Sequence, residues 1–93
     1  MKIIYTPHLK LRLKVRGIPS DLPKKIFKEA EEHYYDTLTQ HYVAVHKLKF
    51  NNKLREVALT YDKKEKVTEI ITIHPLKNYQ KTARINSGRW RKI

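Results

Sequence analysis

The sequence predicts an α+β fold in which two N-terminal helices pack on a three- to four-stranded antiparallel sheet, followed by a short basic C-terminal helix or tail. Its 93 residues are enough for a single domain, residues 1–93, with one modest hydrophobic core. The first third of the chain has helix-forming segments, whereas residues 41–74 are rich in β-branched and aromatic residues. Because three successive strands need a cover on one face, we expect the two preceding helices to supply it.

The first segment, residues 2–7, is a short candidate strand that stops at Pro7, since proline donates no hydrogen bond to a sheet. Residues 8–16 fit two interpretations. Leucines and Val15 alternate with lysines and arginines, which by periodicity alone indicates a half-buried strand. Leucine, lysine and arginine are also good helix formers, Pro7 suits a helix start and Gly17 suits a helix end. We therefore predict a helix.

A second helix is expected after residues 19–23, Pro-Ser-Asp-Leu-Pro, where Ser20 or Asp21 serves as the N-cap. Apolar or aromatic residues then recur at helical spacing, and charged residues fill the outer face. The predicted apolar face consists of Leu22, Ile26, Ala30 and His33 or Tyr34, with Phe27 beside them.

Residues 41–50 and 54–62 predict a β-hairpin joined by the turn Asn-Asn-Lys at 51–53. The apolar positions change parity within the first strand, so a bulge or strong bend is expected near His46 and Lys47. A polar turn leads to a third strand, residues 67–74, which ends at Pro75. Residues 76–84 then predict a short helix with one apolar and one basic stripe, and residues 89–93 are expected to be extended.

The net charge of +12 is distributed unevenly. Residues 1–20 carry five bases and residues 70–93 carry six, and neither segment contains an acid. All nine acids lie between them, together with ten bases. If the fold brings the two ends together, one strongly positive face results, which suits a polyanion such as RNA or DNA, an acidic protein or an anionic membrane surface.

Several classes of protein are excluded by composition. The chain has no cysteine for disulfides or thiolate metal sites, and no apolar window approaches the length of a membrane span. The first residues lack the apolar core of a signal peptide, so we expect a soluble, cytoplasmic protein without a membrane partner. The five histidines have no ligand spacing, and no glycine-rich phosphate loop is present, so neither a metal nor another cofactor is expected.

Cleavage of RNA without a metal requires a general base, a general acid and cations that hold the phosphate. We predict His74 as the acid or base and Arg84 and Arg89 as phosphate clamps, although a histidine beside a proline is often a structural edge residue. Trp90 could stack on a base or pack on the core. The predicted nucleic-acid-binding residues are Arg12, Arg16, His46, Lys47, Lys49, Lys77, Tyr79, Lys81, Trp90 and Arg91.

Residues 8–18, His-Leu-Lys-Leu-Arg-Leu-Lys-Val-Arg-Gly-Ile, resemble the H-x3-R-[LM]-x2-R-G-I opening of a group of small prokaryotic proteins. This group is related to the RelE/ParE-type and BrnT-like toxins, whose wider superfamily has a barnase-like fold. The order of a helix, a strand meander and a basic end is similar to that group over most of the chain. The resemblance therefore implies a RelE-like fold and favours the helical interpretation of residues 8–16.

What the resemblance implies for function is a metal-independent endoribonuclease that cleaves mRNA or acts at the ribosome, held inactive by an acidic antitoxin. No single candidate residue matches a family site one to one. Two alternatives use the same basic face. One is a non-catalytic domain that binds nucleic acid or a partner, and the other is a protein whose basic face is permanently covered by an acidic partner.

Overall fold

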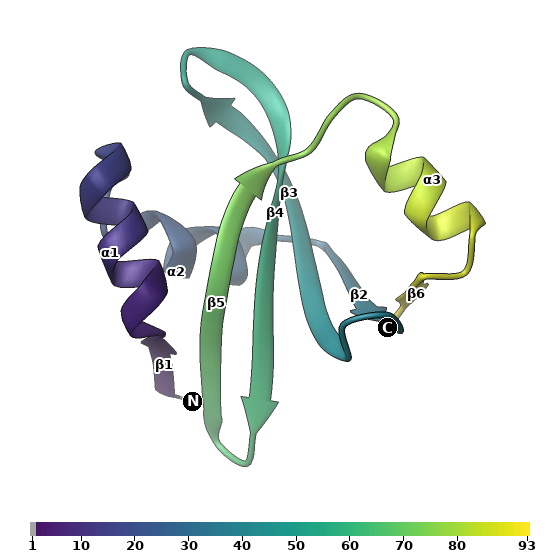
Figure 1. The fold of residues 1–93 in the computed structure, drawn as a ribbon, viewed down its shortest axis with the longest axis horizontal. Coiled ribbons are helices and arrows are strands. Elements are labelled where there is room, and N and C mark those ends of the chain that lie inside the picture. Colours follow the sequence, from purple (N-terminus) through teal and green to yellow (C-terminus); the bar gives the residue numbers. More distant parts are fainter. Residues whose placement is uncertain (1) are drawn as a thin grey trace.

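The computed structural model describes residues 2–93, which form three helices and one six-stranded mixed sheet (Figure 1). The elements in chain order are β1 (Lys2–Tyr5), α1 (Pro7–Arg16), α2 (Leu22–Glu29), β2 (Glu32–Asp36), β3 (His41–Phe50), β4 (Lys53–Lys64), β5 (Val67–Pro75), α3 (Gln80–Asn86) and β6 (Trp90–Lys92). The strand order in the sheet is β1-β5-β4-β3-β2-β6. Strands β1 and β5 are parallel, and the other neighbouring pairs are antiparallel.

The predicted fold was wrong in its sheet. The sheet has six strands rather than three or four, and it contains one parallel pair. Two strands account for most of the difference: β2 occupies residues that helical spacing assigned to the second helix, and β6 pairs with β2 at the far edge of the sheet. The first segment also joins the sheet, since β1 pairs with β5 at the opposite edge.

Helix α2 ends at Glu29 because the residues after it make contacts that only an extended chain can make. The His33 ring lies 2.7 Å from the Tyr61 hydroxyl through Nδ1 and 3.2 Å from the Ala30 carbonyl through Nε2. On the opposite face of the same strand, Tyr34 stacks on Trp90 with ring centres 5.5 Å apart. Aromatic residues suit a pleated surface, and these long-range contacts override the local helical spacing.

Helix α1 confirms the helical interpretation of residues 8–16. The Thr6 hydroxyl accepts a hydrogen bond from the Leu9 amide at 3.1 Å, and Gly17 ends the helix in the left-handed conformation with φ of 65°. Leu9 and Leu13 are buried against the sheet. The alternating leucine pattern therefore does not mark a strand, and it leaves other apolar residues of the helix exposed.

Each face of the sheet carries its own hydrophobic cluster. Helices α1 and α2 cover one face, where Leu9, Leu13 and Ile26 pack with residues of β3, β4 and β5. The second cluster lies on the opposite face and contains Leu76 and Trp90 from the chain after β5. The C-terminal segment thus belongs to the core of the second face.

The predicted bulge near His46 and Lys47 is absent from the β3–β4 pair, whose register runs without interruption from Tyr42 to Phe50. The irregularity lies in the β4–β5 pair instead, between Thr60 and Tyr61. It leaves Ile71 without a partner on β4 and reverses the alternation along β5, so Ile70 and Ile73, three residues apart, both face the first hydrophobic cluster. Figure 1 shows β3 and β4 as long, strongly curved strands.

Among residues 2–93, no helix is long and apolar enough to span a membrane.

The contacts of His33 predict how stability depends on pH. Burial is the main cause that lowers the pKa of His33, and the Lys63 charge lowers it further. The neutral ring accepts a hydrogen bond from the Tyr61 hydroxyl at Nδ1 and donates one from Nε2 to the Ala30 carbonyl, and protonation of Nδ1 would disrupt the first of these. Because the unfolded chain takes up this proton near pH 6.5, we expect the free energy of unfolding to decrease as the pH falls below about 6.5.

Urea denaturation at neutral and mildly acidic pH would measure this decrease. The variant His33→Gln should lose part of the pH dependence, whereas the exposed His8→Ala variant should keep all of it. An identical pH dependence in His33→Gln and in the wild-type protein would contradict the assignment.

Candidate nucleic-acid interface

His74 lies near the end of β5, the strand that stands between α1 and α3 in the view of Figure 1. It pairs with Ala58 of β4, and its side chain is half-buried. Burial is the main cause that lowers the pKa of His74, and the charges of Arg84 and Arg12 lower it further. Burial and the two positive charges therefore favour the neutral form of the imidazole.

Arg84 of α3 is held in place by stacking rather than by an ion pair. Its guanidinium carbon lies 5.2 Å from the centre of the Trp90 ring, which in turn stacks on Tyr34. Burial and the Arg89 charge lower the pKa of Arg84. Within residues 2–93, no carboxylate lies within ion-pair distance of its guanidinium. The guanidinium is therefore positioned and has its donors available for an anion.

Arg89, in contrast, is engaged by an acid of the protein itself. Its Nε and Nη2 atoms donate to the two oxygens of Asp36 at 3.0 Å each. Trp90 Nε1 donates to the same carboxylate at 3.2 Å, and the Leu38 amide donates at 3.0 Å. Burial would raise the pKa of Asp36, but the Arg89 hydrogen bonds and the amides lower it to about 2. Arg89 therefore anchors the C-terminal strand and is not an open phosphate clamp.

Lys81 is neutralised in the same way. Its ammonium lies 2.6 Å from Glu56 and 3.1 Å from Glu32, and Glu32 also accepts a 2.6 Å hydrogen bond from the Tyr34 hydroxyl. The Glu56 hydrogen bond is the main cause that raises the pKa of Lys81, whereas the Tyr34 hydrogen bond is the main cause that lowers the pKa of Glu32. This network joins α3 to strands β2 and β4 and supports the helix that carries Arg84.

The two aromatic candidates have different positions. Trp90 is 3% exposed and packs in the second hydrophobic cluster, so it supports Arg84 and offers no surface to a base. Tyr79, which precedes α3, is 73% exposed and keeps its ring open to solvent. Tyr79 is therefore the candidate with a ring available for stacking.

The remaining predicted residues are distributed over both faces of the sheet. Lys47 is opposite Glu56 in the β3–β4 register, so it lies on the face of the Lys81 network, and Lys49 follows on the same face. His46 points to the other face, 3.7 Å from Glu29 of α2. Arg91 also points away from the face of Trp90 and Lys92 by strand alternation. Arg16 and Lys77 are exposed, at the end of α1 and in the segment before α3.

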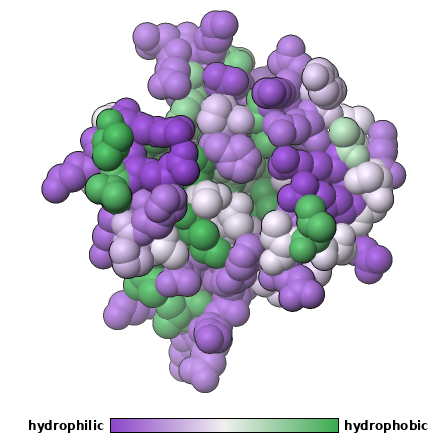
Figure 2. All heavy atoms as spheres, viewed as in Figure 1, coloured by the Kyte–Doolittle hydropathy of each residue, from purple (hydrophilic) through white to green (hydrophobic). Residues whose placement is uncertain are grey.

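We refer to His74, Arg84 and Arg12 as the His74 site. His74 lies on the face of the second hydrophobic cluster, near which Arg84 stacks on Trp90, whereas Arg12 belongs to α1 on the opposite face and acts on the imidazole through its charge. Figure 2 shows the molecule from the side of Figure 1, with hydrophilic side chains over most of the surface and hydrophobic side chains in separate patches. Three acids that sequence reasoning missed, Glu32, Asp36 and Glu56, decide which bases stay open to a ligand. No local signal marks them, because Asp36 and Arg89 are far apart in the sequence.

Within residues 2–93, no three histidine or acidic side chains gather in an arrangement that could hold a metal ion. Comparisons with protein-family models, with curated proteins and with solved structures found no match to this chain. Its function must therefore be argued from the His74 site itself.

Proposed function

We propose that the protein binds RNA at the His74 site and cleaves it without a metal ion, with His74 as the general base. The observation that carries this proposal is a half-buried imidazole on the same face of the sheet as Trp90, on which Arg84 stacks without a carboxylate partner among residues 2–93. A neutral imidazole accepts a proton near pH 7, and the arginines supply the positive charge that a phosphate requires.

In the proposed reaction, Nδ1 or Nε2 of His74 takes the proton of a ribose 2′-hydroxyl. The 2′-oxygen then bonds to the adjacent phosphorus, and the bond from phosphorus to the 5′-oxygen of the next nucleotide breaks. The departing oxygen takes a proton from water and His74 releases its proton to the solvent, which leaves a 2′,3′-cyclic phosphate and a 5′-hydroxyl. Arg84 and Arg12 stabilise the negative charge that develops on the phosphate oxygens.

The experiment that tests this proposal compares RNA with DNA of the same sequence in the presence of a metal chelator. We expect single-stranded RNA to be cleaved to products with 2′,3′-cyclic phosphate ends, and we expect DNA to stay intact because it has no 2′-hydroxyl. Cleavage that stops on addition of the chelator, or cleavage of both nucleic acids, would overturn the mechanism.

Removing the two arginines is expected to weaken RNA binding and its salt dependence. In the variant Arg12→Gln/Arg84→Gln, two phosphate contacts are lost, so the slope of log affinity against log salt should become about 1.4 less steep on single strands. Fluorescence anisotropy at several salt concentrations measures the slope. The matched control is Lys64→Gln/Lys66→Gln, which removes two exposed charges at the β4–β5 turn. An equal effect in the control would mean that binding depends only on net charge.

A second candidate function is nucleic-acid binding without cleavage, and the ion pairs of Arg89 and Lys81 favour it. These pairs neutralise two of the six bases that follow Glu69, so less positive charge remains to stabilise a cleavage transition state. This candidate gives the same salt slope and the same response to the arginine substitutions, but RNA incubated with the protein stays intact.

A further inference from the structure

Helix α1 has a flank opposite the one that carries Arg12. Leu11 is 60% exposed and Val15 is 76% exposed, four residues apart on the solvent side of the helix. Lys10 and Lys14 are also four residues apart and lie next to Leu11 on one flank, while Arg12 lies two residues from each, on the other. Single exposed apolar residues are common on proteins, but here they border a concavity.

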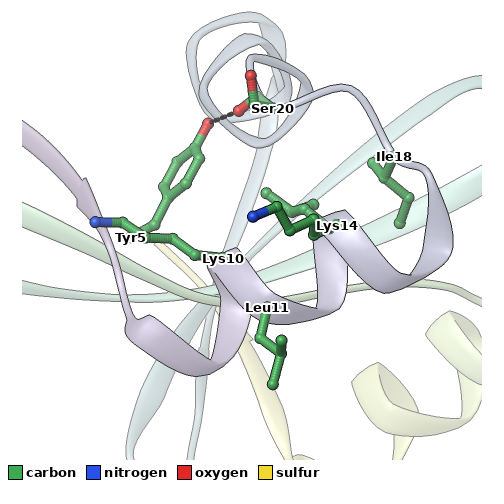
Figure 3. Close-up of a pocket in the computed structure, with 7 residues that line it drawn as sticks. Tyr5, Lys10, Leu11, Lys14, Ile18 and Ser20 are labelled. Carbon is green, nitrogen blue, oxygen red and sulfur yellow. Dashed lines mark hydrogen bonds between the residues drawn. The ribbon is translucent and has the colours of Figure 1, made fainter.

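This concavity is a pocket of about 610 Å³ between α1, the end of β1 and the loop before α2. Figure 3 shows Tyr5 and Ile18 on one side of α1, with the aliphatic stems of Lys10 and Lys14 between them, whereas Leu11 lies at the edge of the lining and points away from the other labelled side chains. The Tyr5 hydroxyl donates to the Ser20 carbonyl at 2.7 Å and accepts from the Lys24 amide at 3.2 Å. These two hydrogen bonds fix the wall of the pocket, so the apolar surface is preformed.

The charge around the pocket selects the kind of ligand. No ion pair engages Lys10 or Lys14 in the described chain, and no acid lines the pocket, although Asp21 follows the lining residue Ser20 and Lys24 lies 5.6 Å from the centre of the Tyr5 ring. A ligand that fits must place an apolar group in the pocket and carboxylates beside the two ammonium groups. A peptide segment satisfies both conditions, whereas insertion into a membrane needs a broad apolar face and α1 exposes only Leu11 and Val15 as large apolar residues.

We propose that this pocket, with Leu11 and Val15 beside it, is the docking site for an acidic peptide segment of a partner protein. A bulky apolar side chain of the segment fills the pocket, and its acidic residues pair with Lys10 and Lys14. Because the site lies on the flank of α1 away from Arg12, this proposal does not depend on RNA cleavage.

The probe for the test is a short fluorescein-labelled peptide in which two leucines, four residues apart, stand among glutamates. Its affinity is measured by fluorescence anisotropy, and its position by chemical-shift changes in NMR spectra of the full chain. We expect saturable binding with shifts at Tyr5, Leu11 and Ile18. Lys10→Glu/Lys14→Glu should weaken binding by about tenfold or more, since it replaces two attractions by two repulsions.

The matched control for charge is Lys25→Glu/Lys28→Glu, which reverses two exposed charges on the neighbouring helix α2 and should change the affinity much less. Leu11→Ser tests the apolar contact at an exposed position that the core does not need, and it should also weaken binding. Three results would overturn the proposal. These are equal binding of a peptide with serine in place of leucine, shifts centred on the His74 site, and tighter binding to vesicles of phosphatidylcholine and phosphatidylserine than to the peptide.

Discussion

Replacing Asp36 by alanine is expected to destabilise the fold by about 3–5 kcal/mol, the cost of removing one partner from a buried ion pair. Asp36 is 3% exposed and accepts hydrogen bonds from Arg89, Trp90 and the Leu38 amide. Without the carboxylate, a partly buried guanidinium and the indole N–H lose their partner. The free energy of unfolding of a domain of this size is itself only about 5–15 kcal/mol, so the loss is a large part of the total.

Urea denaturation measures the loss directly, and the melting temperature should fall by about 12 °C or more. Asp36→Asn keeps one acceptor and should cost less. The matched control is Asp62→Ala. Asp62 pairs with His41 and is much more exposed than Asp36, so its loss should cost no more than about 1 kcal/mol. If Asp36→Ala lowered the free energy of unfolding no more than Asp62→Ala does, the Asp36 carboxylate would not be what holds Arg89 and β6 to the sheet.

Because of the Asp36 carboxylate, we also expect the free energy of unfolding to decrease in acid. The pKa of Asp36 is lowered from 3.8 to about 2 in the folded protein, so the unfolded chain takes up the proton first. The stabilisation by Asp36 is complete above about pH 4 and disappears as the pH falls toward about 2. Asp36→Asn should lack this contribution to acid unfolding, which a comparison of denaturation curves at pH 5 and pH 3 would reveal.

The parts of the fold that sequence reasoning predicted are those with local causes. Helix α1 has Pro7 at its start and Gly17 in the left-handed conformation at its end. The β3–β4 hairpin has Asn51 and Asn52 at positive φ in its turn, as the turn composition indicated. Strand β5 likewise begins after a polar turn and ends at Pro75. In each case the deciding interactions lie within a few residues.

The features of the sheet that were missed, strand β2 and the parallel pairing of the predicted strand β1, depend on distant partners. Strand β2 becomes extended because Tyr34 and His33 meet aromatic residues of β6 and β4, and those residues follow much later in the chain. Strand β1 pairs in parallel with β5, a contact between the two halves of the sequence. Helical spacing in residues 22–34 was a real pattern, but the contacts of the second half of that segment outweighed it.

The sequence predicted that the candidate site is positively charged, but it did not predict which basic residues form it. Arg12 and Arg84, one from each acid-free end of the sequence, both lower the pKa of the His74 imidazole. Sequence alone could not show that Arg89 belongs to Asp36 or that Lys81 belongs to Glu56. Those pairings arise from strand register and packing. They separate the basic residues that form ion pairs within the protein from those that can still bind an anion.

Replacing His74 by alanine is expected to lower the rate of RNA cleavage by about 10²–10⁴-fold, the usual contribution of a general base. Binding of RNA should persist, since Arg12 and Arg84 remain. The matched control is His8→Ala, an exposed histidine at the start of α1, which should keep full activity. Retained cleavage in His74→Ala, with intact folding by circular dichroism, would remove His74 from the mechanism.

The pH profile separates a general base from a merely structural histidine. Burial and the charges of Arg84 and Arg12 lower the pKa of His74, so the neutral base persists as the pH falls below about 6.5 and activity declines only at lower pH. Arg84→Gln removes one of the charges that disfavour the imidazolium ion, so the acidic limb of the rate profile should move to higher pH. A structural histidine would leave that limb in place. A shift toward lower pH in Arg84→Gln would contradict the proposed contact between the arginine and the base, because removing a positive neighbour can only make the imidazole easier to protonate.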